Sequence, residues 1–198
     1  FDFFDGLSAK LLNATSAFGK ELDSLADIVS FGVLPSLILF DIMYPDFTWL
    51  NIDEIRTVSY LVFMIPIFSA LRLAKFNIDT KQTSVFFGFP TPANAFLIAS
   101  IPFVIKNAQI DSIIHFLFTN STFIVILAII CSILLVLPIP LLSFKIKSLS
   151  LRENIFIYVF LVYIITAFAI FGWLGSVLTI LGYFFISMFR TSMPLFKG

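Results

Sequence analysis

Four aspartates stand out near the start of a chain that is otherwise strongly apolar. They are Asp2, Asp5, Asp23 and Asp27. Ionisable groups are costly inside a membrane and usually mark a functional site there. Four carboxylates that face one another repel strongly unless a cation lies between them. The sequence therefore predicts a metal site that these four side chains share.

The spacing of the acids fits two helices that meet. The first two acids are three residues apart and the last two are four residues apart, so each pair lies on one helical face. Small residues continue these faces, namely Gly6, Ala9 and Gly19. Residues 13–18 between the pairs read as a helix end and a restart. Two antiparallel helices would bring all four carboxylates together.

The types of residue in this segment indicate which ligands it takes. Hard oxygen donors with no Cys or His nearby favour Mg²⁺, Mn²⁺ or Ca²⁺ over zinc. Gly6 and Gly19 have no side chains, so a ligand can approach the backbone closely. Lys10 adds a positive charge suited to a phosphate group. The alternative reading is a polar helix end whose acids face water.

Composition places the chain in a membrane. The sequence is 60% hydrophobic and 12% charged, with a mean hydropathy of +1.06, whereas a soluble domain has about 25% charged residues. We therefore predict an all-α, polytopic transmembrane helical bundle. The net charge of zero argues against nucleic-acid binding. The single cysteine, Cys131, excludes an intrachain disulfide and reads as a small buried hydrophobe.

We predict seven hydrophobic helices within one integral-membrane domain that covers residues 1–198. Their approximate ranges are 1–12, 19–43, 56–76, 91–106, 120–142, 154–172 and 175–190. Gly32 and Pro35 predict a kink in the second helix. The first range is too short to span, since a span needs about 20 residues, and the sequence starts without Met. We expect upstream residues that complete this helix and add an eighth.

Loop charges predict the orientation of the bundle. If the loop after the first helix is put on one side, that side collects most of the Lys and Arg residues: Lys10, Lys20, Arg72, Lys75, Lys81, Lys145, Lys147, Arg152, Arg190 and Lys197. The other side has only Arg56 and Lys106. Positive loops stay in the cytoplasm, so the acidic helix ends are expected to open to the cytoplasm from the inner membrane.

A second polar cluster is expected on that same side. Arg72 and Lys75 share one helical face near the end of the third helix, and Asn77 follows them. The next loop contains Gly-Phe-Pro-Thr-Pro at 88–92, which reads as a rigid turn into the fourth helix. The cationic face suits an anionic group. Ordinary membrane anchoring by long side chains explains the same charges.

These motifs resemble a known family. The pattern D-x2-D-G-x2-A-K-x8-G-x3-D-x3-D over residues 2–27 is similar to the signature of CDP-alcohol phosphatidyltransferases, with Lys10 where the family usually has Arg. Residues 23–32, 72–77 and 88–92 look like the phosphatidylserine synthase branch, which more often has Leu where Phe89 stands. The resemblance covers roughly residues 1–105.

The resemblance implies an enzyme of phospholipid biosynthesis. It would transfer the phosphatidyl group from CDP-diacylglycerol, a membrane lipid, to L-serine and release CMP. Asp2, Asp5 and Asp23 would chiefly hold metal ions, Mg²⁺ or Mn²⁺, and Ca²⁺ would also fit. Asp27 would bind metal and act as the catalytic base. The CDP portion would contact Gly6, Ala9, Lys10 and Gly19. Family members are commonly homodimers.

The acceptor is expected to bind at the second polar cluster. A free amino acid presents a carboxylate, which a guanidinium holds with two hydrogen bonds. We therefore predict that L-serine contacts Arg72, Lys75 and Asn77. Three alternatives stay open: a sibling transferase that uses glycerol-phosphate or inositol-phosphate, a divalent-cation transporter, and a membrane scaffold. The phosphorylated acceptors would favour a denser basic pocket, and the later helices carry no polar trail for an ion.

Overall fold

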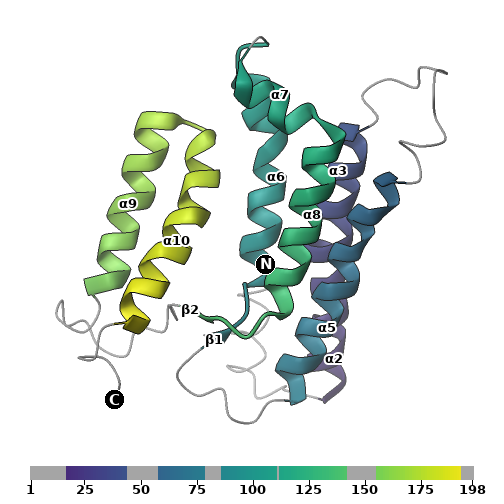
Figure 1. Ribbon diagram of the computed structural model, residues 1–198. Helices are drawn as coiled ribbons and strands as arrows, with labels where there is room; N and C mark the ends of the chain where they lie inside the picture. The colour runs from purple at the N-terminus through teal and green to yellow at the C-terminus, as the bar shows by residue number, and fades with distance from the viewer. Residues whose placement is uncertain (1–16, 44–57, 79–85, 111, 142–154, 193–198) are drawn as a thin grey trace.

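The computed structural model describes residues 17–43, 58–78, 86–110, 112–141 and 155–192. This part of the chain is an all-α bundle, as composition predicted, with one pair of two-residue strands (Figure 1). The elements are α2 (Ala17–Ile28), η1 (Val29–Val33), α3 (Leu34–Met43), η2 (Tyr60–Phe63), α5 (Met64–Ile78), β1 (Phe86–Phe87), α6 (Thr91–Asn107), α7 (Ile113–Thr119), α8 (Ser121–Val136), β2 (Pro140–Leu141), α9 (Ile155–Phe171) and α10 (Leu174–Ser192).

The helices follow the predicted ranges with two differences. The predicted fifth helix, with an approximate range of 120–142 and an end expected around Pro138 and Pro140, ends at Val136, because these prolines cannot continue it. The helix α7 was not predicted; it has seven residues, and Asn120 separates it from α8. Asn120 caps α8 by accepting a hydrogen bond from the Phe123 amide at 3.0 Å. The predicted helix 1–12 lies outside the described residues.

The irregularity predicted near Gly32 and Pro35 is a π-helical turn, η1. The amide of Leu34 donates to the carbonyl of Val29, five residues back, so this turn is wider than an α-helical one. Pro35 has no amide hydrogen, and its ring would collide with the carbonyl four residues back in a regular helix. The widened turn therefore ends at Val33, two residues before Pro35, which a regular helix would not accommodate.

Two helical segments of the described chain are long and apolar enough to cross a membrane, Glu21–Met43 and Tyr60–Ile78. The pair α7 and α8, bent by 70°, would make a third span if it counts as one. Shorter apolar helices follow at Ile155–Phe171 and Leu174–Ser187. The protein is thus an integral membrane protein, and its apolar outer surface is the surface that lipid solvates.

Two clusters of buried side chains hold the helices together. The first joins α3, α5, α6 and α8 through Leu39, Ile65, Ile98 and Ile124. The second joins α6, α8, α9 and α10 through Phe89, Leu97, Cys131, Phe160 and Tyr183. The buried position of Cys131 agrees with its predicted role as a small hydrophobe. In Figure 1, α10 lies between α9 and α6, so the C-terminal pair of helices packs on the rest through α10.

Helix directions bring several polar segments to one end of the bundle. The chain enters α2, leaves α5 and forms the β1–β2 pair at this end, while α7 lies at the opposite end (Figure 1). We call it the polar end. In the strand pair, Phe86 lies opposite Leu141 and Phe87 lies opposite Pro140. The amide of Gly88 donates to the Ile139 carbonyl at 3.0 Å, and that of Phe89 to the Leu134 carbonyl at 3.0 Å. The segment before α6 is thereby fixed to the end of α8.

Gly88→Ala is expected to destabilise this attachment. Gly88 has a φ of +85°, and an added Cβ would lie 2.6 Å from the Leu135 carbonyl oxygen. Both the backbone strain and the clash act against the variant, and together they should lower the unfolding free energy by about 2–4 kcal/mol. Thermal unfolding in lipid nanodiscs measures the effect.

Gly172→Ala is the matched control for that variant. Gly172 also has a positive φ, +56°, but an added Cβ meets no atom within 4 Å. Its loss should therefore be only the backbone term of about 1–2 kcal/mol. Equal losses at the two glycines would contradict the close packing of residues 88–89 against the end of α8.

Candidate functional site

The described half of the acidic motif lies on one face of α2. Asp23 and Asp27 are four residues apart, so they follow one another along the helix, with Gly19 one turn earlier. Ala, Leu, Glu and Lys are good helix formers and make up much of Ala17–Ile28. Asp23 is exposed and Asp27 is half-buried. The two carboxylates therefore sit where α2 passes from the polar end into the bundle.

The second polar cluster meets this face across α2 and α5. The side-chain amide of Asn77 donates a 2.9 Å hydrogen bond to the hydroxyl of Ser24, which lies between the two acids. The guanidinium of Arg72 interacts electrostatically with the carboxylate of Asp27. These contacts join segments about fifty residues apart in sequence. The structure thus brings Asp23 and Asp27 to the same end as Arg72 and Asn77, as the loop charges predicted.

Lys75 lies one turn beyond Arg72 in the last turn of α5 and is exposed. Its charge is therefore available to an anion at the polar end. Asn77 differs from this pair, because one of its amide hydrogens is already directed to Ser24. Its contribution to the site includes holding α5 against α2.

Arg72 has two further neighbours that the sequence analysis did not select. One Nη atom lies 3.5 Å from the hydroxyl oxygen of Thr91, a long contact, and the hydroxyl of Tyr183 interacts with the same charge. Thr91 belongs to the segment 88–92, for which the sequence predicted a rigid turn and no part in a site. Tyr183 comes from α10, whose apolar sequence gave no signal at all. Both residues are buried.

Four buried polar atoms around α5 and α6 have no hydrogen-bond partner within the described chain. They are Ser69 Oγ, Arg72 Nε, Asn94 Nδ2 and Asn94 Oδ1. Native proteins pair most buried polar atoms, so such a group needs an explanation. All four atoms come from residues near the Arg72–Thr91 contact in sequence. Asn94 follows the turn motif at 88–92 by two residues, and its sequence context does not mark it as a site residue.

The described residues fit part of a site for a hard divalent cation. Asp23 and Asp27 supply carboxylate oxygens from one helical face, which Mg²⁺, Mn²⁺ and Ca²⁺ prefer. Within 17–43, 58–78, 86–110, 112–141 and 155–192, no three His, Cys, Asp or Glu side chains come together. The other predicted ligands, Asp2 and Asp5, lie outside the described residues, as do Gly6, Ala9 and Lys10. The complete ligand set stays a prediction.

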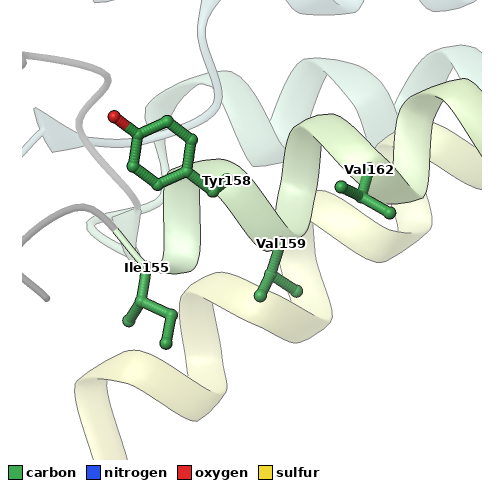
Figure 2. A pocket seen from close by; sticks show the side chains of 4 residues that line it. All are labelled: Ile155, Tyr158, Val159 and Val162. Carbon is green, nitrogen blue, oxygen red and sulfur yellow. The ribbon is translucent and has the colours of Figure 1, made fainter. Parts of the chain in front are cut away.

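A hollow on α9 is unsuited to this chemistry. It has a volume of about 420 Å³ and is lined by Ile155, Tyr158, Val159 and Val162 (Figure 2). Three of these side chains are aliphatic, and the fourth ends in a phenol hydroxyl. Such a surface suits hydrocarbon and offers no carboxylate or cation to a reacting group. The candidate site is therefore the polar end of α2 and α5, away from this hollow.

Chemically, the polar end combines acid–base and anion-binding groups. Carboxylates on α2 can bind a cation or accept a proton, and the Arg72 charge beside Asp27 can hold an anion. The neighbouring helices are apolar enough for lipid chains to remain in the bilayer while a head group reaches the carboxylates. This arrangement suits a reaction between a lipid and a water-soluble molecule.

Comparison with known proteins agrees with this description. A sequence model described as CDP-alcohol phosphatidyltransferase matches residues 1–185. The match thus extends through α9 and most of α10, well beyond the motifs that end near residue 105. It includes the acidic segment whose first part the structure leaves undescribed.

Individual relatives carry one activity in their names. The CDP-diacylglycerol–serine O-phosphatidyltransferase of Helicobacter pylori is 38% identical over 167 residues, which is 81% of this chain and 63% of that protein. Proteins with the same name from Bacillus subtilis and Methanocaldococcus jannaschii are 42% identical over 91 residues and 36% identical over 118 residues. These matches cover 46% and 59% of this chain, and 48% and 52% of the relatives. The chain spans less than two thirds of the length of these relatives.

Proposed function

Because the chain belongs to the CDP-alcohol phosphatidyltransferase family, we propose that it transfers the phosphatidyl group of CDP-diacylglycerol to L-serine. The products are phosphatidylserine and CMP. The names of the Helicobacter, Bacillus and Methanocaldococcus relatives support this acceptor. The observation that carries the proposal is the meeting of Asp27 with Arg72 at the polar end of an apolar bundle. A base and an anion-binding group are what an amino-acid acceptor needs.

Asp27 acts as the general base in this proposal. The hydroxyl of serine is a poor nucleophile until its proton is removed. As the hydroxyl oxygen attacks the phosphorus that bears the diacylglycerol, its proton moves to the Asp27 carboxylate. A phosphorus–oxygen bond forms to serine, and the bond to the CMP oxygen breaks with its electron pair. Asp27 then releases the proton to water. Asp27 is half-buried, and its charge interacts with the guanidinium of Arg72.

The divalent metal, Mg²⁺ or Mn²⁺, is proposed to be held by four carboxylates, those of Asp2, Asp5, Asp23 and Asp27. A divalent cation bound there would neutralise the pyrophosphate and stabilise the departing CMP. Gly19 lies one turn before Asp23 and is exposed, so its backbone is open to the CDP portion. Gly6, Ala9 and Lys10 complete the proposed nucleotide contacts.

Arg72 is proposed to bind the serine carboxylate. Its guanidinium interacts electrostatically with Asp27 and lies 3.5 Å from the hydroxyl of Thr91, so a carboxylate bound to it would lie on the same side of the bundle as the proposed base. Lys75 adds a second charge on the same helical face. Asn77 contributes by fixing α5 to α2 through Ser24, and its remaining amide atoms are proposed to contact the acceptor.

The proposed setting is the cytoplasmic membrane, with the polar end facing the cytoplasm. The excess of Lys and Arg in the loops on that side supports this orientation. L-serine and CMP are soluble there, while CDP-diacylglycerol stays in the bilayer. A homodimer is the assembly we expect from the family resemblance.

The first test is CMP release by the purified protein from CDP-diacylglycerol with a panel of acceptors. L-serine is expected to support release faster than glycerol-3-phosphate or inositol-phosphate. EDTA should abolish release, and Mg²⁺ or Mn²⁺ should restore it, since the carboxylates by themselves repel the pyrophosphate. A phosphorylated acceptor that works better than serine would contradict the acceptor while keeping the family. Full turnover in metal-free buffer would remove the metal from the proposal.

Asp27→Asn is expected to lower kcat by about 10²–10⁴-fold, because a lost general base typically costs that much. Binding of CDP-diacylglycerol should survive better than in Asp23→Asn, whose proposed role is metal binding. Asp41→Asn is the control, since Asp41 is an exposed acid of α3 outside the polar end. Stopped-flow or radiometric CMP release gives the rates. If Asp27→Asn keeps more than about a tenth of the rate, another group is the base.

Arg72→Ala should raise the KM for L-serine far more than the KM for CDP-diacylglycerol. The lost interaction is a charge-assisted bond to the acceptor, so the expected change is about 10–100-fold. Lys106→Ala is the matched control, because Lys106 is an exposed cation near the opposite end of the bundle, in the last turn of α6. Steady-state kinetics with each substrate varied in turn separates the two constants. Equal increases in both would show that Arg72 serves the lipid or the fold.

A further inference from the structure

Asn94 is the most unusual buried side chain of the described bundle. It is 0% exposed, and both its amide nitrogen and its amide oxygen lack a hydrogen-bond partner in the described structure. A buried primary amide has two donor hydrogens and two acceptor positions to satisfy. Leaving them unpaired costs folding free energy that an apolar residue of similar size would not. A ligand that pairs with the amide would account for it.

Asn94 lies next to groups already assigned to the acceptor. Thr91 and Asn94 are three residues apart on α6 and share a face, and the Arg72 guanidinium contacts Thr91. Ser69 and Arg72 are likewise three residues apart on α5. Ser69 is 0% exposed, and its hydroxyl is also unpaired within the described chain. The contact between Arg72 and Thr91 therefore joins a polar pair on α5 to a polar pair on α6.

The π-helical turn η1 packs against both helices and brings the acidic face of α2 to this place. A Cβ at Gly32 would lie 3.0 Å from Pro66 Cα and 3.3 Å from Ser69 Cβ, so η1 approaches α5 as closely as a glycine allows. Asp27 precedes η1 by two residues. The turn η1 thus contacts both helices that carry the unpaired groups, and it directly follows the helix that carries the proposed base.

The unpaired atoms define the chemistry of the ligand. Arg72 Nε and Asn94 Nδ2 are donors and require an acceptor, whereas Asn94 Oδ1 is an acceptor and requires a donor. The Ser69 hydroxyl can serve either way. An amino-acid zwitterion has both kinds of group on its α-carbon. Its carboxylate accepts from the donors, and its ammonium donates to the acceptor. A phosphorylated polyol supplies mainly acceptor oxygens and leaves the amide oxygen poorly paired.

We propose that Asn94, together with Ser69, forms the inner wall of the acceptor site and recognises the α-ammonium and α-carboxylate of an amino acid. This inference rests on the proposed transfer to L-serine and adds residues from α6 to it. Asn94 is one helical turn deeper than Thr91 when counted from the polar end. The side chain of Arg72 contacts Thr91, which lies between the polar end and Asn94 on α6.

The test measures how wild type and a variant without the Asn94 amide use L-serine and two analogues that each lack one of its charged groups. L-serine, 3-hydroxypropionate without the ammonium, and L-serinamide without the carboxylate are assayed for CMP release by wild type and Asn94→Leu. The variant should raise the KM for L-serine about tenfold or more and leave the KM for CDP-diacylglycerol unchanged. The preference of wild type for L-serine over 3-hydroxypropionate should fall by a similar factor.

Ser100→Ala is the matched control. Ser100 is a buried polar residue of the same helix, but its hydroxyl already donates to the Leu97 carbonyl at 2.6 Å. Its kinetic constants should stay at wild-type values. A change in Ser100→Ala equal to that in Asn94→Leu would overturn the proposal, because any buried polar group of α6 would then have the same effect.

Thermal unfolding separates ligand recognition from a structural role. Without serine, Asn94→Leu should unfold at the wild-type temperature or above it, since an unpaired amide is removed. Saturating L-serine should raise the unfolding temperature of wild type and not that of the variant. If the variant unfolds at a lower temperature and keeps the serine KM and the acceptor preference, a buried water satisfies the amide and the inference is wrong.

Asn94→Asp keeps the test decisive if the leucine variant fails to fold. The new carboxylate repels the carboxylate of serine and still accepts from an ammonium, so the preference should shift toward L-serinamide by about tenfold. An unchanged ratio of L-serine to L-serinamide would overturn the inference. Wild-type CMP release that does not depend on serine would instead reject the proposed function itself, which the wild-type arm alone reports.

Discussion

The guanidinium of Arg72 lies among helices that are otherwise apolar. The arrangement of the site follows from the polar groups that this charge requires around it. A guanidinium that enters a bundle of this kind needs oxygen atoms around it, since its desolvation is not offset by apolar neighbours. Thr91 from α6 lies 3.5 Å from it, and Asp27 from α2 and Tyr183 from α10 interact electrostatically with its charge. Helices from the start, middle and end of the chain thus converge on one side chain.

Backbone irregularities make this convergence possible. The π-helical turn η1 lets the helix continue past Pro35 and brings Gly32 against α5. At the polar end, Gly88 adopts a positive φ, and residues 88–89 bond to the end of α8 before α6 begins. Thr91 is placed by this attachment. Each irregularity lies next to a residue of the proposed site, which is where departures from regular helix are expected in membrane proteins.

The bundle has two kinds of surface, a polar end and apolar sides. At the polar end, the carboxylate of Asp23 and the ammonium of Lys75 are exposed to water. Along the sides, residues such as Val159 and Val162 face outward and suit lipid chains. A lipid substrate can therefore keep its tails in the bilayer while its head group reaches Asp23 and Asp27. The division follows from hydrophobicity, since only the ends of a transmembrane bundle are wet.

Sequence alone determined the class of protein, the positions of most helices and the polar character of one end. These features depend on local properties: long apolar runs specify spans, and the spacing of Asp23 and Asp27 specifies one helical face. The family signature is local in the same way, because its residues lie within one stretch of chain. The early end of α8 also had a visible cause in Pro138 and Pro140, although its position was misjudged.

Only the tertiary structure decided which distant residues meet. Tyr183 lies in an apolar helix whose sequence has no feature that pairs it with Arg72. Asn94 lies in the first turns of a predicted helix without a motif of its own, and its burial without partners depends on how α6 packs in the bundle. Contacts of this kind depend on helix packing and on the exact rotation of each helix, which hydrophobic periodicity does not encode when every face is apolar.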